Sequence, residues 1–240
     1  METSYRSYGF VGITKAVVLD VETTGLDPKA DRVIAVGAIK VDFPEMARTG
    51  QAAADSFTCL LNPGCSIPSA ATAVHVIEDS HVAAAECFSD IAQQLRDFIG
   101  DLPIVGHNVQ FDKRFLNAEF RRCKVKGLGR TKSYCMQQRT KEHFGHTGRG
   151  FRRASLIEAA ELFAVRGRRG KHHEALEDAH ICLQVAAGYY LVDNGLKQPP
   201  RVATEPERRD AAKSPASASF PLWVALLLAA GILLVLLLAG

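Results

Sequence analysis

Residues 16–25 read AVVLDVETTG, an apolar run that ends in two acidic residues and a turn. This Val- and Leu-rich pattern predicts a buried β-strand over Ala16–Glu22. Because side chains alternate along a strand, Asp20 and Glu22 should point to the same face at its carboxyl end. Two like charges at the end of a buried strand are unfavourable unless a cation or a shared proton compensates them. Taken alone, the pair is equally consistent with a solvated strand end.

Two further acids lie in elements predicted elsewhere in the chain. Asp112 lies in a helix predicted over Phe111–Cys123, which follows a short strand predicted at Pro103–Gly106. On its own, it could simply be an acid favoured by the dipole at a helix N-terminus. Asp178 shares an apolar stripe of the predicted helix Glu174–Leu191, on the face that should pack against the sheet. An unpaired carboxylate in that position costs several kcal/mol, so Asp178 needs a partner.

The remaining periodic segments complete the expected fold. Strands are predicted at Arg32–Val41 and Phe57–Leu61, and helices at Phe88–Ile99 and Ser155–Phe163. Short linkers make antiparallel neighbours of the first three strands. Strands followed by alternating helices and strands predict an α/β fold, with a mixed sheet that helices flank.

Three segments, taken together, resemble the three motifs of the DEDDh class of 3'-5' exonucleases, which includes the proofreading epsilon subunit of bacterial DNA polymerase III. They are the run DVETTG from Asp20, the run GHNVQFD that ends at Asp112, and the run HEALED from His173 to Asp178. The likeness covers about Lys15–Leu191. It implies a ribonuclease H-like fold, with three antiparallel strands and then parallel strands, and hydrolysis of phosphodiester bonds by divalent metal ions.

The resemblance also implies a role for each acid. Carboxylate oxygens suit hard cations, and two Mg²⁺ or Mn²⁺ ions about 3.5–4 Å apart could clamp a scissile phosphate. By resemblance, Asp20 bridges both ions, Glu22 and Asp178 hold the ion on the nucleophile side, and Asp112 supports the other. His173 would be the general base, because imidazole has a reference pKa of about 6.5 and accepts a proton near neutrality.

By the same resemblance, a pocket for the terminal nucleotide is formed by Thr23, Thr24, Leu26, Asn108 and Phe111. Leu26 and Phe111 are equally reasonable as core residues. Since these side chains select no base, we expect stepwise release of nucleoside 5'-monophosphates from single-stranded 3' ends, of DNA more than of RNA. The alternatives are an exoribonuclease that trims RNA and a non-catalytic, membrane-anchored protein that binds nucleic acid.

Composition and charge favour the same class of partner. The 240 residues are 47% hydrophobic and 23% charged, which excludes a disordered chain, a collagen-like fibre and a polytopic membrane protein. The net charge is only +3, yet residues 121–171 hold 15 lysines and arginines against 3 acids. Although each cluster could be a solvated helix face, a surplus of this size indicates a surface that holds a nucleic-acid backbone.

The C-terminal part predicts a tether and a membrane anchor. After a domain over residues 1–194, residues 195–219 combine four prolines with mixed charges, which is typical of a disordered linker. Residues 220–240 carry no charge and would span about 30 Å as a single transmembrane helix, with the domain on the cytoplasmic side. A buried core helix and a tail removed for a lipid anchor are the alternatives. The sequence does not identify a polymerase or repair partner, nor the membrane that would receive the helix.

The cysteines and the remaining histidines are not predicted to take part in the reaction. The six cysteines show no spacing typical of a metal site, so we expect reduced thiols, with Cys59, Cys123 and Cys182 in the core. Surface positions are predicted for the remaining single histidines, His75, His81, His143, His146 and His180.

Overall fold

The computed structural model describes residues 9–50, 55–146, 154–165 and 174–200, which belong to one compact unit, Met1–Arg201. His173, most of the predicted linker and the predicted transmembrane helix 220–240 lie outside the described residues. Among the helices that are described, none combines the length and the apolar character needed to cross a membrane.

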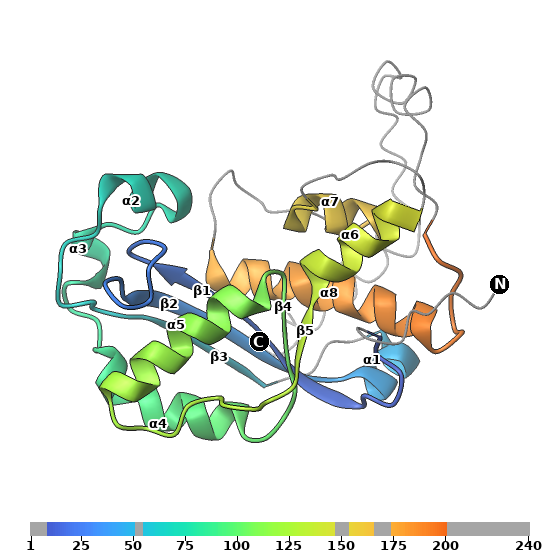
Figure 1. The fold of residues 1–240 in the computed structure, drawn as a ribbon, viewed down its shortest axis with the longest axis horizontal. Coiled ribbons are helices and arrows are strands. Elements are labelled where there is room, and N and C mark those ends of the chain that lie inside the picture. Colours follow the sequence, from blue (N-terminus) through green and yellow to red (C-terminus); the bar gives the residue numbers. More distant parts are fainter. Residues whose placement is uncertain (1–8, 51–54, 147–153, 166–173, 201–240) are drawn as a thin grey trace, which may run out of the picture. The chain divides into compact units, whose positions relative to one another are not determined.

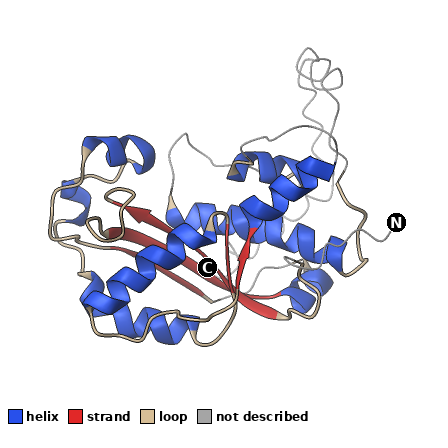
Figure 2. Ribbon diagram, viewed as in Figure 1, coloured by secondary structure: helices blue, strands red, loops and turns tan. Residues whose placement is uncertain are grey.

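Five strands form one mixed sheet in the order β3-β2-β1-β4-β5 (Figure 2). The antiparallel strands β1 (Lys15–Thr23), β2 (Val33–Asp42) and β3 (Ser56–Leu60) come first in the chain, and β4 (Ile104–Gly106) and β5 (Ser133–Cys135) run parallel to β1. The predicted mixed sheet is therefore confirmed. Strand β5 was not predicted, because Ser133, Tyr134 and Cys135 do not form an apolar run like the one that marks β4.

The helices that periodicity predicted are confirmed, and several short ones are added (Figure 1). The predicted set is α4 (Phe88–Ile99), α5 (Val109–Arg122), α7 (Leu156–Leu162) and α8 (Ala175–Asp193). The added set is α1 (Phe43–Thr49), α2 (Ser69–His75), α3 (Asp79–Val82) and α6 (Met136–His146). Helix α1 depends on local capping, since the Asp42 carboxylate accepts the N–H of Glu45 at 3.0 Å.

Alternation along β1 divides the core into two layers. Ala16 and Val18 pack with buried residues of α7 and α8 on one face of the sheet. Val17, Leu19 and Val21 pack with α4 and α5 on the other face. Since side chains two residues apart share a face, Asp20 continues the α8 side of the strand.

Two of the surface predictions for histidines are wrong. His75 and His143 are only 3% and 7% exposed; His75 is the last residue of α2, and His143 lies in α6. His81 and His180 are exposed as predicted, and the side chain of His146 lies outside the described part of the structure. All six cysteines are free thiols; Cys182 is buried as predicted, whereas Cys59 and Cys123 are half-buried.

A close approach of α8 to β2 sets the position of Asp178. A Cβ atom on Gly37 would lie 2.4 Å from the Leu176 nitrogen and 2.5 Å from the Ala175 carbonyl carbon. Gly37 is also the ladder partner of Asp20 on β1. The missing side chain at Gly37 therefore lets the first turn of α8 lie next to the acidic end of β1.

We expect Gly37→Ala to push α8 away from the sheet and to lower the free energy of unfolding by about 1–3 kcal/mol, as overpacking does. Urea unfolding measures this change. The matched control is Gly145→Ala in α6, where a Cβ would meet nothing within 4 Å. The control should match the wild type or gain up to about 1 kcal/mol. Equal stability of both variants would show that α8 does not depend on this contact.

Candidate active site

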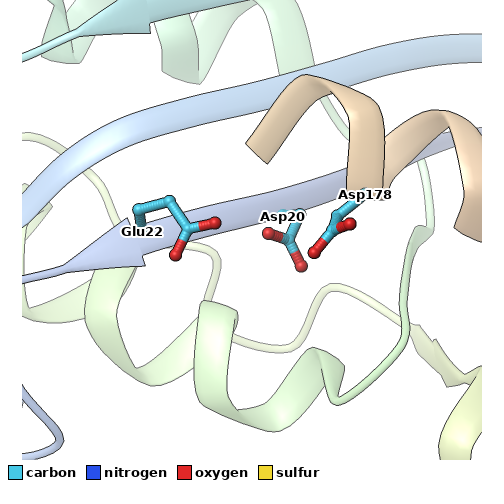
Figure 3. Close-up of side chains that lie close together, drawn as sticks. All are labelled: Asp20, Glu22 and Asp178. Atoms are coloured by element: carbon cyan, nitrogen blue, oxygen red, sulfur yellow. The ribbon is translucent and has the colours of Figure 1, made fainter. Parts of the chain in front are cut away.

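Three carboxylates from two elements meet at the end of β1. Asp20 and Glu22 lie on the last residues of the strand, and Asp178 lies in the first turn of α8. One oxygen of each lies within 4.8 Å of the others. Figure 3 shows Asp20 and Asp178 facing each other, with the Glu22 carboxylate turned toward them. Such an all-oxygen group suits a hard divalent cation, which would also offset the repulsion between the acids.

Asp112 approaches the same strand end from the opposite layer. It lies in α5 and is only 3% exposed, and its Oδ1 accepts the N–H of Val21 at 3.1 Å. Burial, with a smaller contribution from the charge of Glu22, raises the pKa of Asp112 to about 7. Asp112 lines the same cavity as the other acids but is not part of their close group. A bound cation would favour its charged form.

A cavity of about 650 Å³ opens beside the carboxylates. Apart from His173, which is not described, the predicted site residues all line it: Asp20, Glu22, Thr23, Thr24, Leu26, Asn108, Phe111, Asp112 and Asp178. Leu26 is 82% exposed, so the core interpretation is wrong for it. Phe111 is half-buried, with its ring 4.8 Å from that of Phe115, so it serves both the core and the cavity wall.

The two threonines hold the shape of the loop that follows β1. Thr23 Oγ1 donates to the Gly25 carbonyl at 2.6 Å. Thr24 Oγ1 accepts the Arg32 N–H at 3.0 Å and donates to Asp31 Oδ1 at 3.3 Å. Because both hydroxyls are engaged within the loop, their contribution to the cavity is to fix its backbone.

One wall of the cavity was missed by sequence reasoning. It is formed by α2 and the residue before it, through Pro68, Ala70, Ala71, Val74 and His75. Small apolar residues carry no chemical signal, and His75 was assigned to the surface. His107 and Leu156 also line the cavity. The position of His107 inside the GHNVQFD run was the one available indication.

A thiol near the acids is inert. Cys182 is buried one turn after Asp178, and burial raises its pKa well above the usual value, with Asp20 and Asp112 adding to the effect. The thiolate is the nucleophilic form of cysteine, so a thiol held neutral does not attack a substrate. The chemistry of this cavity therefore rests on its carboxylates.

The fold is similar to that of solved structures. A structure of exonuclease I superposes with a TM-score of 0.61 at 15% sequence identity, over 75% of this chain and 41% of that chain. Exonuclease I of E. coli in complex with a dT13 oligonucleotide also gives a TM-score of 0.61, at 14% identity, over 75% of this chain and 41% of that chain. This chain thus spans less than half of exonuclease I, and at such identities the likeness establishes the fold.

The sequence establishes the family. Residues 17–186 match the family described as Exonuclease. The DNA polymerase III subunit epsilon of Rickettsia typhi is 31% identical over 175 residues, which are 71% of this chain and 72% of that protein. The DNA polymerase III PolC-type of Thermotoga maritima is 30% identical over 169 residues, which are 70% of this chain but 11% of that protein. The chain belongs to the exonuclease family, as its motifs predicted.

Family and geometry agree on the cofactor. Exonucleases of this family use two-metal catalysis, and Asp20, Glu22 and Asp178 form the group that could bind the metal. Carboxylate oxygens from separate elements are the donors that Mg²⁺ and Mn²⁺ prefer. The predicted pair of divalent ions thus fits the residues that are present.

The raised pKa of Asp112 gives stability a pH dependence. Its carboxyl titrates near 3.8 when unfolded and near about 7 when folded, so the folded chain binds more protons between these values. Without divalent metal, stability should fall as pH rises through this window, by on the order of 4 kcal/mol in total. Asp112→Asn should not show this part of the decline in stability. At pH 8 its free energy of unfolding should therefore exceed that of the wild type.

Urea unfolding at pH 4 to 8 in the presence of EDTA measures this difference. At pH 8, adding Mg²⁺ should raise the stability of the wild type more than it raises the stability of Asp112→Asn. Parallel pH profiles of the two proteins would contradict the raised pKa.

Proposed function

We propose that this chain is a 3'-5' exonuclease that removes nucleoside 5'-monophosphates from single-stranded 3' ends, of DNA in preference to RNA. The observation that carries the proposal is the meeting of Asp20, Glu22 and Asp178 within 4.8 Å beside the 650 Å³ cavity. The relatives add support, since exonuclease I has been solved with dT13 and dA16 oligonucleotides and other relatives are subunits of DNA polymerase III.

Each element of the site contributes ligands or a proton acceptor to the proposed reaction. Asp20 and Glu22 of β1 and Asp178 of α8 would hold one cation, and Asp112 of α5, together with Asp20, would support the second. When bound, the cations supply an activated water and stabilisation of the leaving 3' oxygen. His173 precedes Asp178 by five residues in the sequence and accepts the proton of the attacking water.

The residues of the cavity wall favour an exonuclease without preference for a particular base. Leu26 and Phe111 offer apolar contact to the terminal base, which any base satisfies. Asn108 is exposed at the N-terminus of α5, where its amide reaches the cavity. Since cations act on the phosphate and not on the 2'-hydroxyl, the RNA-trimming alternative differs only in sugar contacts. A non-catalytic binding protein would have no use for acids on packed faces.

Asp20→Ala should lower the rate of cleavage about 1,000-fold or more, because the bridging ligand of both cations is lost. The assay follows the product ladder of a single strand with a 5' label in Mg²⁺, with matched DNA and RNA sequences deciding the substrate. Asp97→Ala, on the exposed face of α4, is the matched control and should cleave normally. EDTA should stop the wild type. An unchanged ladder for Asp20→Ala would refute the metal assignment.

His173→Ala should reduce the maximal rate by about 10²–10⁴, the usual contribution of a general base. It should also flatten the rise of the rate with pH around the ordinary imidazole pKa of about 6.5. Single-turnover rates between pH 5.5 and 9 test both effects. His172→Ala removes the adjacent imidazole and should keep the wild-type profile. If the pH profile of His173→Ala were unaltered, the general base would be another group.

We further infer that residues 220–240 anchor the chain in a membrane, with the exonuclease domain on the cytoplasmic side. The support is the uncharged run itself and the cations Arg201, Arg208, Arg209 and Lys213, which precede it in the linker. Membrane fractionation of cells that express the full chain or residues 1–219 tests this inference, and a full chain in the soluble fraction would contradict it. The epsilon relatives support a polymerase or repair complex as partner.

A further inference from the structure

A second cavity, of about 430 Å³, lies at the start of β4 and is lined by cations. We call it the distal cavity, and its charged residues are Arg96, Lys126, Arg130, Lys132 and Asp101. Pro103 lines it just before β4 begins, whereas His107 and Asn108, just after β4 ends, line the carboxylate cavity. The two cavities therefore lie at opposite ends of one short strand.

The positive charge of the distal cavity is poorly balanced by protein groups. The Arg96 side chain is 11% exposed, and its Nη2 lies 3.6 Å from an oxygen of Asp101, whose own side chain is fully exposed. The buried Nε of Arg96 makes no hydrogen bond to any described residue. Across the described ranges, no acidic group lies within 4.0 Å of the exposed cations Lys126, Arg130 and Lys132. The Arg96 guanidinium also donates to the Gly100 carbonyl, and its positive charge beside three exposed cations suits a phosphate.

The loop that presents these cations is held in place by contacts with α5 and β4. The Leu128 N–H donates to Asn117 Oδ1 at 2.7 Å, and Lys113 Nζ donates to the Thr131 carbonyl at 2.7 Å. The Lys132 carbonyl accepts the Ile104 N–H at 2.9 Å. Since the middle and the C-terminal end of the loop are anchored, the backbone that carries its cations is ordered before a ligand arrives, which reduces the ordering cost of binding.

Strand β5 and the residues just before it run alongside β4, between the two cavities. Cys135 Sγ donates to the His107 carbonyl at 3.2 Å, next to the carboxylate cavity. Two residues earlier, Ser133 Oγ accepts a hydrogen bond from Gln110, and Thr131 already lines the distal cavity. The extended segment from 135 back to 131 covers about 13 Å at 3.3 Å per residue. At the 3.4 Å rise of a stacked strand, that is about four nucleotides.

We propose that the distal cavity binds a backbone phosphate of the substrate strand, several nucleotides before the 3' end that is cleaved. This inference rests on the proposed function, because it takes the 3' end to lie at Asp20, Glu22 and Asp178. It makes binding depend on strand length: strands that reach from one cavity to the other gain contacts that a trinucleotide lacks. A free phosphate or a released nucleoside monophosphate shares the same chemistry and is distinguished below.

Fluorescence anisotropy with the full-length chain in detergent measures the length dependence, with Asp20→Ala included throughout to prevent cleavage. In that background, Lys126→Gln, Arg130→Gln and Lys132→Gln together should weaken binding of a 15-nucleotide strand about tenfold or more. The slope of log affinity against log salt should fall by about 0.7, which corresponds to one phosphate contact on a single strand. Binding of a trinucleotide should change less than about twofold.

Lys197→Gln is the matched control, since it removes an exposed cation away from both cavities, and it should bind both strands as the parent does. Equal losses for the two lengths, or no loss for either, would overturn the proposal. A circular dichroism spectrum equal to that of the parent checks that the triple variant is folded.

A second variant tests the cavity through a gain of affinity, which misfolding does not produce. Asp101→Asn removes the acid beside Arg96, and its full exposure makes a change of fold unexpected. It should tighten binding of the 15-nucleotide strand about two- to fivefold and leave the trinucleotide unaffected. Unchanged or weaker binding of the long strand would contradict the assignment.

Competition identifies the source of the phosphate. Inorganic phosphate and a nucleoside 5'-monophosphate, at constant ionic strength, should not lower affinity for the long strand to that of the triple variant. If either does so, the cavity binds free phosphate and the proposal is overturned. If the wild-type chain does not cleave but binds long strands through the distal cavity, the proposed exonuclease activity is contradicted and the phosphate site stands. If it cleaves normally but its binding does not depend on strand length, the phosphate site is contradicted and the exonuclease activity stands.

Discussion

The repulsion between carboxylates at the end of β1 is the constraint on which the site depends. Asp20, Glu22 and Asp178 lie within 4.8 Å of one another, and Asp112 is buried beside the same strand with its pKa raised to about 7. Folding alone does not favour such a cluster, because burial and like charges both oppose ionisation. The core must therefore hold the acids together until a cation compensates them, which ties the stability of the fold to its chemistry.

Two properties of one strand allow the acids to converge. Alternation sends Asp20 toward α8, while the backbone N–H of Val21 binds Asp112 of α5 on the other side. The side-chain-free position at Gly37 then admits the first turn of α8, which carries Asp178. The sheet thus collects ligands from both of its layers at one edge, where a substrate can reach them.

Long periodic elements and the acidic positions could be predicted from the sequence, because each has a local cause. The alternation of β1 and the stripe of α8 placed Asp20, Glu22 and Asp178 on packed faces, and the resemblance of the three motifs gave these acids their role as metal ligands. Strand β5 and helix α2 could not be predicted, since neither has a clear apolar or periodic pattern and both depend on tertiary contacts, as the pairing of Ser133–Cys135 with β4 illustrates. His75 was misplaced for the same reason, because α2 carries it into the cavity wall.

The arrangement of charge also has a consequence for the order of events on the enzyme. A nucleic acid is repelled by the carboxylate cluster before cations arrive, but it is attracted at any time by Lys126, Arg130 and Lys132 at the other end of β4. Attraction of the backbone therefore needs no metal, whereas seating of the 3' end does. The net charge of +3 thus includes two separate regions of opposite charge at opposite ends of one strand. The cationic region attracts the nucleic-acid backbone, and the acidic region binds the cations needed for cleavage.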